Sequence, residues 1–157
     1  MKIKFIHDWP LEETLVFEDQ YSDDLKIDLA YKKEFKALGG EFIYILDAES
    51  NVPIGETYFI EVKKLNEDLQ GLSHWLKKNA VYVYSTTILP QYQHKGFGKI
   101  LKAYFLGYVR TKYRYAIGHA RENGSIKLNK NFGAQIISEE INWQNSGETY
   151  YFYNIDL

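Results

Sequence analysis

The stretch AVYVYSTTILPQYQHKGFGKIL, residues 80–101, decides the fold of this chain. Its first ten residues are rich in β-branched and aromatic side chains, which is typical of a β-strand over 80–89. Turn residues and two glycines follow from Pro90 to Gly98. The hydrophobic side chains beyond Gly98 recur at helical spacing. The stretch therefore predicts a strand, a glycine-containing loop and a long helix.

This order of elements favours an anion site. The first N–H groups of a helix have no partner within the helix, and they lie at the positive end of its dipole. Gly96 and Gly98 would let the backbone approach a ligand closely, a diphosphate is the natural occupant, and Lys95 and Lys99 would add charge at the rim. The alternative is that the glycines only form a tight turn. The loop lacks the Gly-Lys-Ser/Thr ending of a P-loop and the third glycine of a G-x-G-x-x-G motif.

On the N-terminal side of this stretch, the pattern predicts a strand at 1–7 and a hairpin of strands at 41–47 and 54–62. Between them, 11–31 is acidic and compatible with a helix, and Ser22-Asp23-Asp24 could cap a second helix that ends at Gly39-Gly40. Residues 63–79 carry leucines at helical spacing and fit either a short amphipathic helix or an ordered, lid-like insertion.

On the C-terminal side, the long helix presents an apolar stripe, with lysine and arginine elsewhere; the stripe is Ile100, Leu101, Tyr104, Phe105, Tyr108 and Val109. A strand at 113–120, a short helix at 125–132 closed by Gly133 and a final hairpin at 134–157 turning at 144–147 follow. No internal repeat or linker is visible. We therefore expect a single α/β domain over 1–157, with a mixed, mostly antiparallel sheet of six to seven strands flanked by helices.

Composition excludes several classes of function. The chain has no cysteine, so disulfides, thiolate metal sites and a cysteine nucleophile are excluded. The four histidines show no metal-ligand spacing, and we expect no metal site. No apolar run reaches membrane-spanning length, the first ten residues lack a signal-peptide pattern, and no dense Lys/Arg stripe suits nucleic acid. A cytoplasmic protein without membrane or nucleic-acid partners is expected.

Residues 88–101 resemble the acetyl-CoA-binding motif of the GCN5-related N-acetyltransferase (GNAT) superfamily. The family pattern, Gln/Arg-x-x-Gly-x-Gly/Ala, is matched at Gln93, Gly96 and Gly98, between a strand that ends near Pro90 and a long helix. The order of elements extends the resemblance over essentially the whole chain. It implies the acyl-CoA N-acyltransferase fold, with acetyl-CoA as co-substrate.

The resemblance also implies roles for individual residues. The strand before the loop would contact the pantetheine arm, and the backbone N–H of Thr86 would polarise the thioester carbonyl during catalysis. The implied coenzyme contacts are Ile88, Gln93, His94, Lys95, Gly96, Phe97, Gly98, Lys99, Asn123 and Ser125.

The acid and base of the reaction are less clear. Asn129 stands where family members often carry a tyrosine that protonates the leaving thiolate, and a carboxamide is no useful acid. Tyrosines of the tail could substitute: Tyr150, Tyr151 and Tyr153. For the base, Glu56, Glu61 and His119 are candidates, and the unperturbed pKa of a histidine suits that task.

The sequence thus predicts an enzyme that transfers an acetyl group from acetyl-CoA to a primary amine, by direct attack in a ternary complex. The acceptor could be a small molecule, a polyamine or a peptide amine, and the acidic N-terminal half favours a cationic one. The alternative is a non-catalytic GNAT-fold protein that binds acyl-CoA as a sensor or interaction module. The tyrosine-rich tail would suit a homodimer contact.

Overall fold

One seven-stranded sheet forms the centre of the molecule in the computed structural model, which describes residues 1–21, 25–65, 72–122 and 124–157. The strand order is β1-β2-β3-β4-β5-β7-β6, and among the described strand pairs only β4 with β5 is parallel. The predicted mixed, mostly antiparallel sheet is confirmed. The strands are β1 (Ile3–Ile6), β2 (Glu41–Asp47), β3 (Pro53–Glu61), β4 (Ala80–Ile88), β5 (Tyr115–Arg121), β6 (Gln135–Glu140) and β7 (Tyr150–Asp156).

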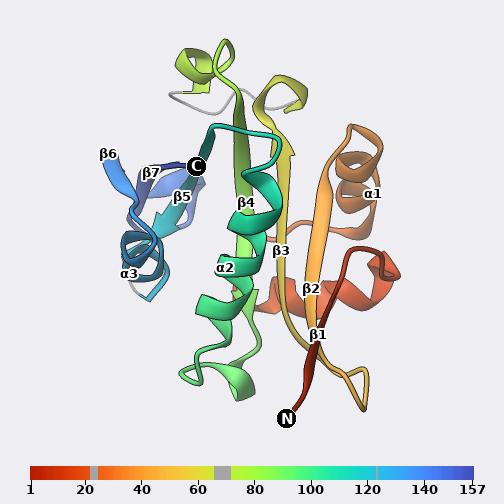
Figure 1. Cartoon of the computed structure of the whole chain (residues 1–157). Helices are drawn as coiled ribbons and strands as arrows, with labels where there is room; N and C mark the ends of the chain where they lie inside the picture. Colours follow the sequence, from red (N-terminus) through yellow and green to blue (C-terminus); the bar gives the residue numbers. More distant parts are fainter. Residues whose placement is uncertain (22–24, 66–71, 123) are drawn as a thin grey trace.

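The two faces of the sheet carry separate hydrophobic cores, because side chains alternate along each strand. Along β2, Phe42 and Tyr44 join one core, whereas Ile43 and Ile45 join the other. The first core is covered by the 3-10 segment η1 and the helix α1, and the second by the helices α2 and α3 (Figure 1). The bounds of these four elements are η1 (Leu11–Gln20), α1 (Leu29–Ala37), α2 (Phe97–Val109) and α3 (Gly124–Asn131).

The first covering layer differs from the prediction. Residues 11–20 form a 3-10 helix, because Leu11, Thr14 and Phe17 repeat every three residues and the hydroxyl of Thr14 donates to the carbonyl of Leu11 at 2.7 Å. The predicted capping cluster at 22–24 lies outside the described residues. The N-cap of α1 is instead Asp28, whose carboxylate accepts a hydrogen bond from the N–H of Tyr31 at 2.8 Å.

The segment 63–79 is described only in part. Two short 3-10 turns, η2 (Val62–Lys64) and η3 (Leu72–Trp75), flank the residues that are not described. Val62, Leu72 and Trp75 are buried in the core on the η1 side. The described ends of the segment therefore pack against the sheet.

Two predicted surfaces are corrected by burial. On α2, Ile100 and Tyr104 are exposed, whereas Lys102 is buried, because the helix faces the sheet with Gly98, Leu101, Lys102, Phe105 and Val109. The second surface is that of the tyrosines in the C-terminal tail, which were expected to be exposed. Tyr150 and Tyr153 are buried, because β7 lies between β5 and β6 and both of its faces are covered. These tyrosines therefore belong to the interior and do not form the proposed dimer surface.

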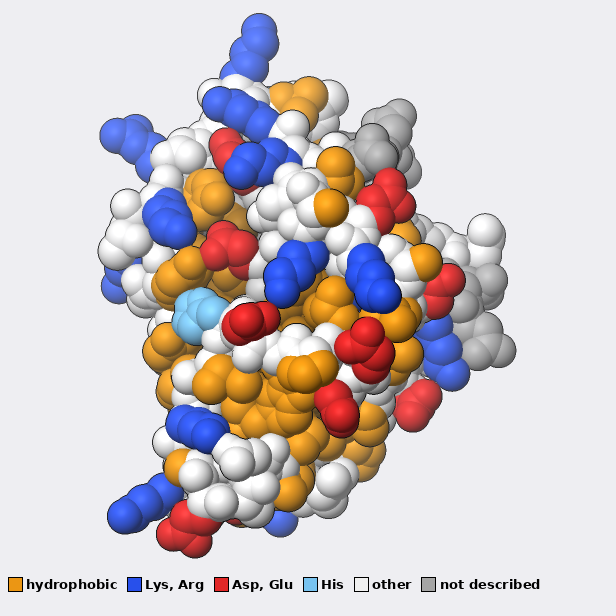
Figure 2. All heavy atoms as spheres, turned by 90° about the vertical axis from the view of Figure 1, so that its right-hand side faces the viewer, with side chains coloured by type: hydrophobic (Ala, Val, Ile, Leu, Met, Phe, Trp, Pro, Cys, Tyr) orange, Lys and Arg blue, Asp and Glu red, His pale blue; other side chains and the backbone are white. Residues whose placement is uncertain are grey.

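The outer surface over β1, η1 and α1 is mixed in character. Figure 2 shows hydrophobic side chains on this face interrupted by acidic and basic ones. Over the described ranges, no helix combines the length and the apolar character that crossing a bilayer requires.

Candidate functional site

A cleft opens where β4 and β5 part. The two strands pair only from Ala80 to Val83 on β4 and from Tyr115 to Gly118 on β5, although β4 continues to Ile88. Beyond Val83, the β5–β7–β6 part of the sheet leans away from β4 (Figure 1). A cavity of about 570 Å³ lies between the two arms. We call the Val83–Gly118 pair the closed end of this cleft.

A β-bulge changes which way the β4 side chains point. Tyr58 of β3 pairs with Ser85, and the next residue of β3 pairs with Val83, so Tyr84 is the extra residue. After the bulge, Ser85 and Thr87 turn their hydroxyls toward η1, while Thr86 faces the α2 side, where its hydroxyl lies 3.0 Å from that of Thr57. No described strand pairs with this edge of β4 beyond Val83, so a ligand with amide groups can lie along it near Thr86.

The loop after β4 has the geometry of an anion site. His94 and Gly96 adopt left-handed backbone conformations, with φ of 61° and 88°. None of the N–H groups from His94 to Lys99 makes a hydrogen bond of ordinary geometry to another described residue, and the first helical bond runs from Ile100 to Gly96. Successive free N–H groups of this kind form a concave anion-binding surface. A Cβ on Gly96 would meet nothing within 4 Å, so the space outside the loop is open.

The predicted coenzyme residues surround the cavity or form this loop. Gln93 ties the loop to the strand, since its side-chain amide donates to the carbonyl of Ile88 at 2.9 Å. Lys95 is held within the loop by a bond to the carbonyl of Gln91 at 3.0 Å. Asn123 lies outside the described residues. Those that line the cavity are Ile88, Gln93, His94, Gly98 and Ser125, while Lys95, Gly96, Phe97 and Lys99 complete the loop without lining it.

The described cavity wall carries basic side chains but no acidic ones. Among the described residues, no aspartate or glutamate lines the cavity, whereas Lys102 and Arg121 do. Arg121 has a carboxylate partner, Glu148, at 3.6 Å. Lys102 is 1% exposed and donates to the hydroxyl of Tyr153 at 3.5 Å, and burial lowers its pKa to about 7. Such a wall suits an anionic ligand.

His119, a predicted candidate for the base, lies on the wall of the cavity, but its environment is unusual. Its Nδ1 lies 2.8 Å from the hydroxyl of Tyr82, and its ring stacks on Trp143 at 3.8 Å and on Phe152 at 4.8 Å. Its Nε2 is buried without a hydrogen-bond partner among the residues that the structure describes. Burial lowers the pKa of His119 to about 3, so the ring is neutral at pH 7 and its basicity is much lower than that of a free histidine.

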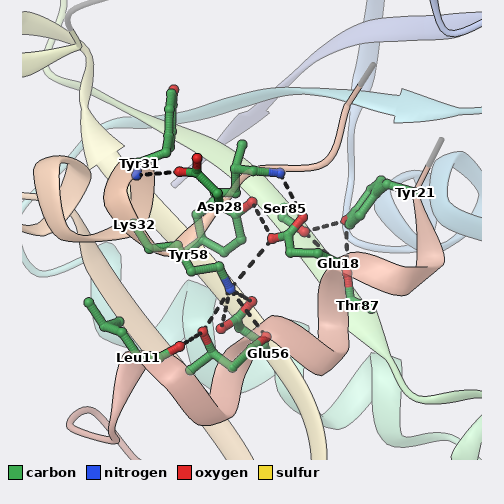
Figure 3. Close-up of polar contacts among 12 residues, drawn as sticks. Leu11, Glu18, Tyr21, Asp28, Tyr31, Lys32, Glu56, Tyr58, Ser85 and Thr87 are labelled. Atoms are coloured by element: carbon green, nitrogen blue, oxygen red, sulfur yellow. Dashed lines mark hydrogen bonds and ion pairs between the residues drawn. The ribbon is translucent and has the colours of Figure 1, made fainter. Parts of the chain in front are cut away.

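Glu56, another predicted catalytic residue, belongs to a buried ionic cluster outside the cavity wall. Its carboxylate accepts from the ammonium of Lys32 at 3.4 Å, and Lys32 also lies 3.5 Å from Glu18 and 2.8 Å from the hydroxyl of Thr14 (Figure 3). Burial raises the pKa of Glu56, and the charge of Lys32 opposes the shift. This cluster joins η1, α1 and β3, so it fixes the covering layer onto the sheet.

Tyr21, which follows the last residue of η1, lines the cavity on its η1 side. Its hydroxyl contacts the hydroxyls of Ser85 and, at 2.8 Å, Thr87 (Figure 3). A smaller pocket joins the cavity here and is predominantly aromatic; its lining is Tyr21, Leu25, Tyr58, Tyr82, Tyr84, Ser85, His119, Trp143, Gln144 and Tyr150. The two spaces share Tyr21, Tyr84, Ser85, His119 and Tyr150 in their walls, so the small pocket lies beside the cavity on its η1 side.

Several residues of the site were missed at the sequence level. Lys102 could have been noticed, because it lies four residues after Gly98 and three before Phe105, on the buried side of α2. Tyr21 and Arg121 carry no such pattern. They meet only because η1 and β5, which are far apart in the sequence, approach each other in the fold.

Comparisons with known proteins place this fold. No protein-family model matches the sequence, and no curated protein sequence matches it. Among solved structures, Arabidopsis thaliana NAA60 in complex with acetyl-CoA is 14% identical over 99% of both chains, with a TM-score of 0.76. Ribosomal-protein-alanine N-acetyltransferase from Brucella melitensis is 14% identical over 98% of this chain and 99% of its own, with a TM-score of 0.71.

A protein from Desulfovibrio desulfuricans that is assigned to the GNAT family of acetyltransferases gives the same result. It is 14% identical over 99% of both chains, with a TM-score of 0.72. At this level of identity the likeness establishes the fold. The chain has the GNAT acyl-CoA N-acyltransferase fold that its sequence motif predicts.

Proposed function

We propose that this protein is an N-acetyltransferase that transfers the acetyl group of acetyl-CoA directly to a primary amine. One observation carries the proposal: the loop from His94 to Lys99, whose N–H groups make no ordinary hydrogen bond to another described residue, borders the cleft between β4 and β5 at His94 and Gly98. The loop can bind an anion, and the strand β4 that precedes it has an edge along which amide groups can pair. This arrangement fits a ligand in which a diphosphate is followed by an arm that contains amides. Coenzyme A has this order of groups.

The chain provides a fitting contact for each part of that ligand. The loop N–H groups bind the diphosphate, and the open space beside Gly96 leaves room for it. The β4 edge at Thr86 and Ile88 pairs with the amides of the arm, as an added strand would. The thioester then lies toward the closed end of the cleft, where the backbone N–H of Thr86 polarises its carbonyl.

The amine reaches the carbonyl from the η1 side. The aromatic pocket beside Tyr21 adjoins the cavity there, and His119 lines both spaces. Since no described carboxylate lines the cavity, an ammonium group would find no counterion in its wall. The acceptor therefore reacts as a neutral amine, and the buried Nε2 of His119 can accept a hydrogen bond from it, with water carrying the proton away.

Similar structures support this assignment by analogy of fold. Arabidopsis NAA60 has been solved with a bisubstrate analogue, and a Salmonella typhimurium protein with acetyl-CoA as its cofactor. Both share the fold at 15% identity. Neither determines the acceptor of this chain, so the acceptor class proposed here remains a primary amine.

Two measurements test the proposal. Isothermal titration of the protein with acetyl-CoA should give saturable binding, and release of free CoA should then depend on an added amine from a panel of amino acids, polyamines and peptides. Binding without amine-dependent release would indicate the acyl-CoA sensor. An absence of binding to any acyl-CoA would remove the enzyme hypothesis altogether.

A further inference from the structure

Lys102 is a buried lysine on the wall of the proposed acetyl-CoA cavity, and no described residue gives it an acidic partner. Its side chain is 1% exposed, no ion pair to it is recorded among the described residues, and no described carboxylate lines the cavity. A buried ammonium is costly unless it is paired. Lys32, the other fully buried lysine, has Glu18 and Glu56 beside it. The partner of Lys102 is therefore expected to be part of the ligand.

The position of Lys102 indicates which part of the ligand it meets. It lies four residues after Gly98, which places it one helical turn further into the cleft than the loop. Its ammonium contacts the hydroxyl of Tyr153, and an ideal Cβ on Gly118 would lie 2.7 Å from that hydroxyl. Gly118 is the last residue of β5 that pairs with β4. Lys102 thus lies nearer the closed end of the cleft than the loop does.

Resting on the proposed function, we propose that Lys102 is the catalytic acid that protonates the sulfur of coenzyme A as the thioester is cleaved. The nitrogen of the acceptor attacks the carbonyl carbon and a C–N bond forms. The C–S bond breaks, and its electron pair stays on sulfur. The ammonium of Lys102 gives a proton to that sulfur, the attacking nitrogen loses one to water, and solvent returns a proton to Lys102 after the thiol leaves.

The other groups on this wall are poorer acids. Asn129 has no ionisable proton, and its amide donates to the carbonyl of Ser125 at 2.9 Å. Burial raises the pKa of Tyr153 far above that of a thiol. Burial lowers the pKa of Lys102 to about 7, below the value of about 8.5 that is typical of a thiol, so proton transfer from Lys102 to sulfur is downhill. Tyr153 is the only titratable side chain recorded in hydrogen-bond contact with Lys102 among the described residues.

The test compares Lys102→Met, Lys102→Arg and wild-type protein, with the exposed Lys130→Met on α3 as the control. We expect Lys102→Met to bind acetyl-CoA with an unchanged Kd, measured by titration, and to lose about 100-fold in kcat for the best amine of the panel. In the wild type, kcat should fall as the pH rises through the pKa of Lys102 in the complex. This alkaline limb should be absent in Lys102→Met and in Lys102→Arg, whose guanidinium keeps its proton.

The outcomes separate this inference from the proposed function. If the wild type does not bind acetyl-CoA or form amide, the proposed function fails. If the wild type is active and Lys102→Met keeps its kcat and its alkaline limb, the role of Lys102 is overturned. Acetylation of Lys102 itself, seen as an acetylated peptide by mass spectrometry after incubation with acetyl-CoA, would also overturn it, because the side chain would then act as a nucleophile.

Discussion

The guanidinium carbon of Arg121 lies 4.8 Å from the ring centroid of Tyr21, and this contact crosses the cleft. Tyr21 is bonded through its hydroxyl to Thr87 on β4, whereas Arg121 is the last residue of β5. Arg121 also donates to the hydroxyl of Tyr150 at 2.7 Å and to the carbonyl of Gln20 at 3.0 Å. Side chains thus connect the two arms where the backbone pairing between β4 and β5 has ended.

Removing this bridge should weaken the fold measurably. Arg121→Met keeps an aliphatic stem but leaves the hydroxyl of Tyr150 and the carbonyl of Gln20 without their donor, so we expect the free energy of unfolding to fall by about 2 kcal/mol. Tyr21→Phe keeps the ring under the guanidinium and should cost about 1 kcal/mol. Urea unfolding measures both, with the exposed Arg110→Met as the control. Equal stabilities of Arg121→Met and Arg110→Met would contradict the bridge.

The loop can be tested with two glycines of the same helix. In Gly98→Glu, the new Cβ lies at an ordinary distance of 3.5 Å from Leu128, and the carboxylate stands in the first turn of α2, where the diphosphate is proposed to bind. Because like charges at a binding site cost several kcal/mol, we expect the Kd for acetyl-CoA to rise by about 100-fold or more.

The matched control for this variant is Gly107→Glu, at an exposed position of α2 where a Cβ would meet nothing within 4 Å. Both variants should stay folded, because a glutamate is a better helix former than a glycine. In Gly98→Glu the negative charge also lies near the helix N-terminus, where it is favourable. Titration calorimetry measures the affinity and thermal melting the fold. If Gly98→Glu binds acetyl-CoA as tightly as Gly107→Glu does, the loop is not the diphosphate site.

The cluster around Lys32 should be sensitive to loss of its cation. Lys32→Met leaves the buried carboxylates of Glu18 and Glu56 close together without a counterion, so we expect a loss of about 3–5 kcal/mol in the free energy of unfolding. Its neighbour Lys33 pairs with Glu12 at 4.0 Å, and both side chains are more than half exposed. Lys33→Met should therefore change stability by less than about 1 kcal/mol. Similar unfolding midpoints for the two variants would contradict the structural role of Lys32.

Much of the fold was predictable because local patterns decide it. The strands β2 and β4 and the helix α3 lie within one residue of their predicted bounds, since β-rich runs, glycines and turn residues mark their ends. The start of α1 was not predictable in the same way. Both Ser22-Asp23-Asp24 and Asp28 are suitable caps, and tertiary packing of Phe35 and Lys32 decides which turn begins the helix.

The site was predictable only where the backbone forms it. The loop from Gln93 to Lys99 follows from its glycines and from the helix after it. Side-chain functions depend on burial, which sequence does not give. His119 has the unperturbed pKa of a good base, but its stacking on Trp143 and Phe152 removes it from water. Glu56 resembled a solvated strand residue, yet it is 1% exposed beside Lys32.

The burial of Lys102 should make the free energy of unfolding of the ligand-free protein depend on pH. Its pKa is about 7 in the folded protein, against 10.5 for an unperturbed lysine, because the ammonium is buried. Between these values the unfolded chain binds more protons than the folded one, so this lysine makes stability rise as the pH increases from 7 to 10.5. Below pH 7 both states are protonated, and the folded protein bears the full penalty of the buried charge. Lys102→Met removes that penalty.

Lys102→Met should therefore be more stable than the wild type by a few kcal/mol at pH 6, and the difference should shrink toward zero as the pH approaches 10.5. Chemical unfolding at a series of pH values measures this difference. Lys130→Met, which removes an exposed lysine, should show no pH-dependent difference from the wild type over the same range. The opposite outcomes are that Lys102→Met is less stable at pH 6, or that its gain in stability stays constant with pH. Either result would mean that the ammonium of Lys102 is paired or hydrated in the folded state, and it would contradict a buried lysine without a counterion in the cleft.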